Sequence, residues 1–480
     1  MKRAMVEATV LFVLLSLVCA TLETTGQGAK WRSRVDVPYV QASELPRWRS
    51  VRILCRMGVL RPSLGDLTLR DLQPTRAAEP GLHDSLLRYS LEPTSARPLL
   101  STEILPQLIP RPDPRLLVAS VVALPADLYS PSRGIVAHPE GRGRAWERPA
   151  AFSLVQGGRL LFEGMAGLRI AGHCARLEPK KHFRLFFSDA YGPGPDIGAI
   201  FGEPGQTRSG EPVQHLTFRS WRSSGELGNC NLGYKLARRL SVAVPAARPC
   251  LLYINGRCHG LYGLTEQVDA DFCGRHYGHD DFNLFFIWPR GARRVELGPT
   301  DEPVALAEGL WNLYQASPAE VNRVEAAVDL SALVHASVFA VYSGAVDAQP
   351  YLARDRTVPR AKWFPVFWDL DDTLRPRPEC NALRWMLGQD AVCGPLLTYS
   401  PTFQQTFRVE MRYELDTTLS ADSLLPLVDQ WAAELAPGVP FEQWAWGSPS
   451  PDQWQRQVNK IRDFIKKRPE VVRRQLWAWG

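Results

Sequence analysis

Short apolar runs of strand length dominate the chain between about residue 116 and residue 265. Runs of this kind, bounded by glycine, proline and polar clusters, are typical of β-strands. The predicted strands are 116–124, 151–155, 159–162, 167–170, 182–187, 250–254 and 259–264. Two pairs of them flank Gly157-Gly158 and Asn255-Gly256, and dipeptides of this type favour tight hairpin turns. The pattern therefore predicts a β-rich region in this part of the chain.

Helical periodicity replaces the strand pattern further along the chain. Apolar residues recur at near-helical spacing in 232–242, with basic residues on the other side, which predicts an amphipathic helix. A second apolar series in 330–341 predicts a buried helix, and residues 375–480 are predicted to be mostly helical. Together these patterns predict an α+β protein with strands first and helices later.

The first 20 residues have the layout of a signal peptide. Lys2 and Arg3 precede the apolar run from Val10 to Val18, and a small residue, Ala20, follows at the expected cleavage position. A retained N-terminal anchor is the alternative. No later stretch is long and apolar enough to span a bilayer. We therefore expect an exported protein, secreted or held at the cell surface, that is not an integral membrane protein after cleavage.

Residues 21–112 are predicted to form an extension that ends in a proline-rich linker, and we assign no chemistry to them. The whole chain of 480 residues is 45% hydrophobic and 22% charged, as in globular proteins. Its net charge of +6 comes from scattered basic residues, which argues against a nucleic-acid partner. Nine cysteines, eight after signal cleavage, permit disulfides in an exported protein, but their spacing does not determine the pairing.

One stretch, residues 363–374, combines an apolar run with three carboxylates. Its sequence is Trp-Phe-Pro-Val-Phe-Trp-Asp-Leu-Asp-Asp-Thr-Leu. The apolar run predicts a buried strand, and carboxylates at the exit of a strand can hold a divalent cation such as Mg²⁺. The alternative without chemistry is an acidic turn after a core strand.

A second carboxylate, Asp347, is expected close to the first of these three, Asp369. Residues 351–354 and 362–368 are predicted to form a hairpin, and a hairpin brings its two outer ends together. Phosphoryl transfer needs this arrangement, in which one carboxylate accepts the hydroxyl proton and another holds Mg²⁺ on the phosphates of ATP. A helix-end turn is the alternative interpretation of Asp347.

Five short sequence blocks follow one another along the chain. They are Gly134-Ile135-Val136 with Trp146-Glu147-Arg148-Pro149-Ala150; Gly167-Leu168-Arg169-Ile170-Ala171-Gly172 with Pro179-Lys180-Lys181-His182-Phe183-Arg184-Leu185; Asn255-Gly256 through Gly260-Leu261-Tyr262 to Glu266; Trp368-Asp369-Leu370-Asp371; and Ile461-Arg462-Asp463-Phe464-Ile465-Lys466-Lys467-Arg468-Pro469. In order and spacing these blocks resemble the CotH (spore-coat protein H) kinase-like family of atypical secreted kinases. The resemblance runs from about residue 117 to the C-terminus.

The resemblance implies a two-lobed, protein-kinase-like fold, with a β-rich N-lobe over 113–265 and a mainly helical C-lobe over 266–480. It also implies binding of ATP and Mg²⁺ and phosphorylation of Ser or Thr in a secreted or surface protein. The residues expected to act are Asp347 as general base, Asp369 as the first metal ligand, Asp371 as a second ligand or its support, Lys180 or Lys181 on the phosphates, and Glu266 near adenine. A solvated strand end and a helix-start carboxylate are the structural alternatives for the lysines and for Glu266.

The chain departs from the family pattern beside Asp347. Only Ala348, Gln349 and Pro350 separate Asp347 from Tyr351, so Gln349 takes the place of a metal-binding Asn. An inactive surface or adhesion protein with the same fold is therefore one alternative. A second alternative is a haloacid-dehalogenase-type phosphatase, whose opening motif residues 366–374 resemble, with Asp369 as nucleophile and Asp371 as acid/base. The late position of this motif argues against the phosphatase.

Overall fold

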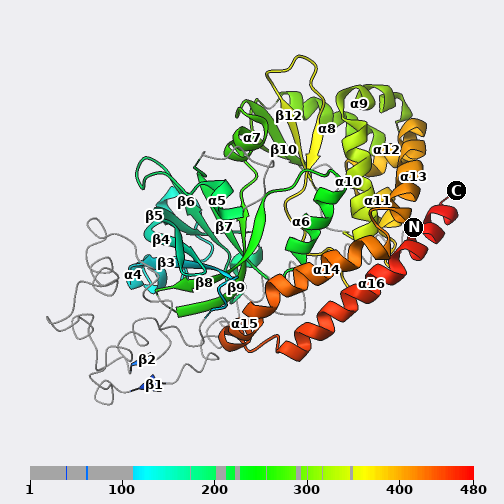
Figure 1. The fold of residues 1–480 in the computed structure, drawn as a ribbon. Helices are drawn as coiled ribbons and strands as arrows, with labels where there is room; N and C mark the ends of the chain where they lie inside the picture. The colour runs from blue at the N-terminus through cyan, green and yellow to red at the C-terminus, as the bar shows by residue number, and fades with distance from the viewer. Residues whose placement is uncertain are drawn as a thin grey trace, which may run out of the picture.

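The protein combines a β-barrel, a second small sheet and a large group of helices (Figure 1). The computed structural model describes residues 39–40, 61–62 and 112–479, apart from 173, 202–211, 222–226, 256, 288–292, 300, 316 and 346–349. The predicted signal peptide and nearly all of the predicted extension lie outside the described residues. Two short segments of the extension, β1 (Tyr39–Val40) and β2 (Arg61–Pro62), pair in parallel.

Seven strands close into a barrel in the order β3-β4-β5-β6-β7-β9-β8. Their bounds are β3 Leu117–Ala123, β4 Arg148–Gln156, β5 Arg159–Ile170, β6 Phe183–Phe186, β7 His215–Ser220, β8 Ala247–Ile254 and β9 Arg257–Glu266. The β4–β5 hairpin turns at Gly157-Gly158, and both glycines adopt positive φ. The strands β8 and β9 pair as far as Ile254 and Arg257, on either side of the other predicted dipeptide. The parallel pairing of β3 with β8 closes the barrel.

The strand β3 is buried along its whole length because its two faces belong to different cores. Leu117, Ala119 and Val121 point into the barrel, whereas Leu116 and Val118 join the larger core shared with the helices. A strand buried on both faces has no polar side to present to water, which agrees with a sequence that is apolar except for the buried Ser120. The barrel wall is therefore packed against the helical part of the molecule on this side.

The second sheet is antiparallel, in the order β11-β10-β12-β13. Its strands are β10 Phe282–Ile287, β11 Arg293–Leu297, β12 Tyr351–Asp355 and β13 Phe364–Val366. The predicted hairpin is confirmed, with Tyr351 opposite Val366. The strand β13 is shorter than predicted because its flanking residues bond elsewhere: Trp363 bridges to Val328, and the Phe367 N–H donates to the Ala243 carbonyl.

Three α-helices, α4 to α6, lie between barrel strands in the sequence, and the other helices make up most of the chain after the barrel. Their bounds are α4 Pro125–Tyr129, α5 Ile197–Phe201, α6 Asn229–Arg239, α7 Ala270–Tyr277, α8 Asp301–Tyr314, α9 Val321–Ala327, α10 Leu330–Ser343, α11 Ala382–Gln389, α12 Cys393–Tyr399, α13 Pro401–Asp416, α14 Ala421–Leu435, α15 Val439–Trp446 and α16 Pro451–Ala478. The long α16 lies along α14, and α15 reaches back to strand β9 of the barrel (Figure 1). The helices predicted over 232–242 and 330–341 are present as α6 and α10.

The predicted α+β class is confirmed, but the arrangement differs from the one that the resemblance implied. The β-rich region closes into a barrel, rather than forming one lobe of a clear two-lobed kinase fold. Closure depends on pairing between β3 and β8, whose partners Leu117 and Cys250 are far apart in the sequence. In the described part of the chain no helix is both long and apolar enough to cross a membrane. Six cysteines there have free thiols: Cys230, Cys250, Cys258, Cys273, Cys380 and Cys393.

Candidate functional site

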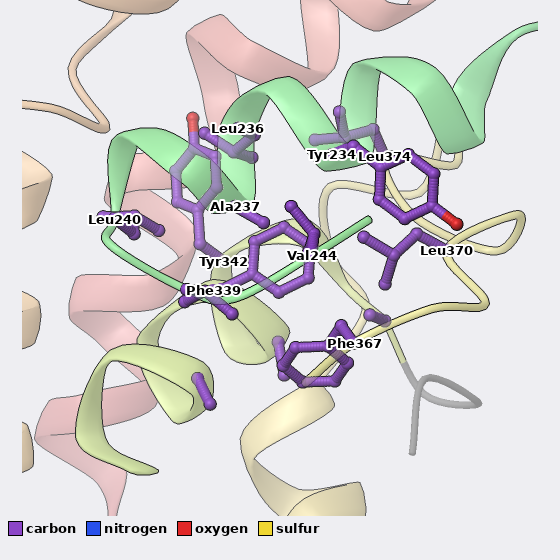
Figure 2. Close-up of a cluster of buried hydrophobic side chains, with 14 of the residues drawn as sticks. Tyr234, Leu236, Ala237, Leu240, Val244, Phe339, Tyr342, Phe367, Leu370 and Leu374 are labelled. Carbon is purple, nitrogen blue, oxygen red and sulfur yellow. The ribbon is translucent and has the colours of Figure 1, made fainter. Parts of the chain in front are cut away.

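The three carboxylates of the motif lie on a loop of residues 367–374, here called the acidic loop, which follows β13. Its apolar residues Phe367, Leu370 and Leu374 are buried. They turn toward residues of α6 and α10, such as Ala237 and Phe339 (Figure 2). Because apolar and acidic residues alternate here, burial of Leu370 orients its two acidic neighbours away from the core.

Helix α6 holds the acidic loop with polar contacts from its first turns. The Asn229 side chain donates to the Thr373 carbonyl at 3.1 Å, and the Tyr234 hydroxyl donates to the Trp368 carbonyl. Between them, Gly233 allows close approach, since a Cβ there would lie 2.7 Å from the Thr373 hydroxyl oxygen. The loop is thus fixed by a helix that precedes it by more than a hundred residues.

Arg219 on β7 binds two of the three carboxylates. Its Nη2 atom lies 2.6 Å from Asp369 Oδ1 and 3.0 Å from Asp371 Oδ2. Burial by itself would lower the pKa of Arg219, but the charges of Asp371 and Asp369 outweigh it and hold this pKa well above its ordinary value. The guanidinium also lies over the Trp368 ring, 5.7 Å from its centroid. The third carboxylate, Asp372, pairs instead with Arg375.

The carboxylates bound by Arg219 fit part of a magnesium site. The Asp369 side chain is 45% exposed, so it can be reached from solvent. In Asp371, Oδ1 is buried and has no hydrogen-bond partner among the described residues. Two carboxylates against one guanidinium leave a net negative charge, and Mg²⁺ prefers such oxygen ligands, often one or two carboxylates completed by phosphates and water. In the described ranges no group of three His, Cys, Asp or Glu residues forms a metal site.

Lys180 lies just before β6 and is buried in an ion pair with Glu442 of α15. Its Nζ atom is 2.7 and 2.8 Å from the two carboxylate oxygens and 2.6 Å from the Leu261 carbonyl oxygen. Glu442 also accepts a hydrogen bond from the Leu261 N–H. All three ammonium protons thus have protein partners, so the phosphate contact predicted for Lys180 would require this pair to open.

His182 connects the region of Lys180 with that of Arg219. Burial lowers the pKa of its imidazole to about 3; Arg219 and Lys180 lower it further, and Asp369 opposes them. The ring is therefore neutral at physiological pH. Lys181, the other predicted phosphate ligand, is half-buried and donates to the Arg176 carbonyl at 2.7 Å. Burial lowers its pKa as well.

Glu266, predicted near adenine, is buried in a cluster of its own at the end of β9. It accepts hydrogen bonds from Arg275 at 2.9 Å and from the Ala246 N–H at 2.7 Å, and it contacts His276 at 3.0 Å. Burial by itself would raise the pKa of Glu266, but His276, Arg275 and the Ala246 N–H outweigh it and lower this pKa. These contacts give Glu266 a structural role; adenine contact stays a prediction.

Asp347 was predicted to lie close to Asp369 because the segments between them were predicted to form a hairpin. That hairpin is present as β12–β13. Tyr351 and Val366 pair at the end of the hairpin from which the acidic loop departs. Asp347 and Gln349 themselves lie outside the described residues, and their roles as base and metal ligand stay predictions.

Three residues at or next to this site were missed from the sequence: Arg184, Arg219 and Glu442. The two arginines alternate with buried apolar residues along their strands, in Phe183-Arg184-Leu185 and Leu216-Thr217-Phe218-Arg219. This alternation predicts that they point out of the barrel, and it was available as a signal. Glu442 had no such signal, because its partner Lys180 is 262 residues away.

Comparison with known proteins agrees with the family resemblance drawn from the sequence blocks. A family model described as CotH kinase protein matches residues 168–472. This range includes the barrel strands β6 to β9, the acidic loop and α15. No protein among the curated ones matches the chain.

Proposed function

Because the chain belongs to the CotH kinase protein family, we propose that it transfers the γ-phosphate of ATP to Ser or Thr of a protein. The observation that supports this most is the pair Asp369 and Asp371, which meet on one nitrogen of Arg219 at the end of a hairpin. Phosphoryl transfer relies on positioning and on charge neutralisation rather than on covalent chemistry by the protein.

In the proposed site, each residue has one task. Asp369 and Asp371 hold Mg²⁺, which offsets negative charge on the phosphates when bound, and Gln349 supplies a further oxygen. Asp347 accepts the proton of the substrate hydroxyl. Lys181, and Lys180 if its pair with Glu442 opens, face the phosphates. Glu266 lies near adenine while its contacts with Arg275, His276 and the Ala246 N–H stay intact.

The protein substrate is proposed to be secreted or attached to the surface. The supporting observation is the signal-peptide layout of the first 20 residues. Nothing in the charge pattern suggests a nucleic-acid partner.

A protein of this family that binds a partner without phosphoryl transfer is the second candidate. Two contacts favour it: Arg219 occupies oxygens of both carboxylates, and Glu442 occupies Lys180. The haloacid-dehalogenase-type alternative gains no support, since β13 belongs to an antiparallel sheet rather than to the parallel sheets whose carboxyl ends bind such ligands.

Calorimetric titration of residues 21–480 with ATP, with and without Mg²⁺, tests the proposal. We expect binding that requires Mg²⁺ and weakens at least about tenfold in Asp369→Asn, because a metal ligand is lost. Asp463→Asn is the matched control, since Asp463 is an exposed carboxylate that pairs with Lys467 on α16.

Transfer from labelled ATP to a Ser/Thr peptide library, compared with Asp347→Ala, separates the two candidates. Mg²⁺-dependent ATP binding with no transfer to any peptide would favour the binding protein. If ATP does not bind at millimolar concentration, the proposed kinase function is refuted.

A further inference from the structure

Four side chains form a row across the outer face of the barrel, one from each of β5, β6, β7 and β9. Arg169 is opposite Arg184, Arg184 is opposite Thr217, and Thr217 is opposite Thr265. An adjacent residue on each strand points inward: Leu168, Leu185, Leu216 and Leu264 are buried in the barrel core. The row therefore points away from the barrel interior.

Arg184 differs from its basic neighbours because none of the described residues forms an ion pair with it. Arg169 pairs with Glu147 at 2.8 Å, and Arg219 pairs with Asp369 and Asp371. The only side-chain hydrogen bond that Arg184 makes within the described residues runs from its Nε to the Thr217 hydroxyl, at 3.2 Å. Its two Nη atoms have no acceptor there.

This guanidinium is also partly removed from water. Burial lowers the pKa of Arg184 to about 10; Asp269 and Tyr351 oppose this, and the like charges of Arg169 and Arg219 add to it. Partial burial of a charge that has no acidic partner among the described residues is unfavourable, and a ligand of opposite charge would offset this cost.

The residues whose charges shift the pKa of Arg184 belong both to the barrel and to the second sheet with its neighbouring segment, so Arg184 lies between them. Arg169 and Arg219 come from the barrel strands, Asp269 from the segment before α7, and Tyr351 from β12. The Tyr351 ring in turn contacts Trp368 of the acidic loop, with centroids 5.7 Å apart. Arg184 thus belongs to the surface that Arg219 shares with Asp369.

We propose that Arg184 binds the phosphates of ATP through its two free Nη atoms, an inference that rests on the proposed kinase function. A guanidinium with both Nη atoms free offers the parallel pair of donors that matches two phosphate oxygens. Lys180, predicted for this task from the sequence, has its three protons engaged by protein acceptors. Thr217 holds the Nε side of Arg184 and leaves the Nη side for the ligand.

Calorimetric titration with Mg·ATP, inorganic tripolyphosphate and adenosine tests this assignment in the wild type, Arg184→Gln and Arg184→Lys. We expect Arg184→Gln to weaken ATP and tripolyphosphate about 10-fold to 100-fold and to leave adenosine unchanged, since a charge-assisted bidentate contact is lost. Arg184→Lys keeps the charge but not the paired donors, so its loss should be smaller. Arg462→Gln on α16, whose partner is Asp429, is the matched control.

A second measurement needs no variant. Phenylglyoxal modifies accessible arginines, and peptide mass spectrometry follows each of them in the wild type. We expect ATP to slow modification of Arg184 but not of Arg462. Unchanged ATP affinity in Arg184→Gln, or no protection by ATP, would overturn the assignment while the kinase proposal stands. Absence of ATP binding to the wild type would overturn both.

Discussion

The ion pair between Lys180 and Glu442 should be a principal link between α15 and the barrel. The two side chains are 8% and 1% exposed, and Nζ contacts both carboxylate oxygens within 2.8 Å. Removing one partner of a buried pair leaves the other charge uncompensated and costs about 3–5 kcal/mol. We therefore expect Glu442→Gln, which keeps the shape and an acceptor for the Leu261 N–H, to lower the free energy of unfolding by about that amount.

A double-mutant cycle isolates the pair from the other contacts of each residue. Lys180→Met in the Glu442→Gln background removes the uncompensated charge, so the double variant should be more stable than the Glu442→Gln single variant. Coupling of at least about 2 kcal/mol is expected, because contacting residues in one network are not additive.

Urea unfolding followed by circular dichroism gives the four free energies, and hydrogen–deuterium exchange of α15 (Val439–Trp446) gives a local readout. Faster exchange confined to α15 and β9 in Glu442→Gln would agree with a link between these elements. Additive losses below about 1 kcal/mol for each single variant would refute the reasoning, since exposed pairs contribute no more than that.

Two further predictions concern the acidic loop and the cluster at the end of β9. Gly233→Ala places a Cβ 2.7 Å from the Thr373 hydroxyl oxygen, so we expect a loss of about 1–3 kcal/mol and weaker Mg·ATP binding by calorimetry. Gly388→Ala on α11, where a Cβ meets nothing within 4 Å, should be neutral or stabilising, and equal effects of the two changes would contradict this. Glu266→Gln should cost about 2–3 kcal/mol at pH 7 in urea unfolding. Because the folded pKa of Glu266 lies below its ordinary 4.5, its contribution is complete above that pH and is lost as the pH falls through the folded value, so the gap between wild type and variant should narrow there. If the difference in unfolding free energy between wild type and Glu266→Gln does not change with pH, these contacts do not depend on the charge of Glu266, and the prediction is wrong.

Local patterns in the sequence predicted the features that depend on neighbouring residues. The Gly157-Gly158 turn, the helix α10 and the β12–β13 hairpin follow from spacing and turn chemistry within a few positions. The acidic loop was located by the same reasoning, since its carboxylates follow a short apolar run directly. With Leu370 buried, Asp369 stays accessible to solvent and Asp371 is half-buried against Arg219.

Only the tertiary structure decided how these elements meet. Closure of the barrel joins Leu117 to Cys250, and the site joins Arg219 to Asp369, 150 residues later. Lys180 was predicted to contact phosphate, but in the structure it pairs with Glu442, 262 residues away. Periodicity reports which face of an element is buried but not which element covers it, because hydrophobic burial is non-directional. The alternation of apolar and polar residues can therefore indicate that Arg184 points outward. That no described residue serves as its counter-ion follows only from the packing of the strands and loops around it.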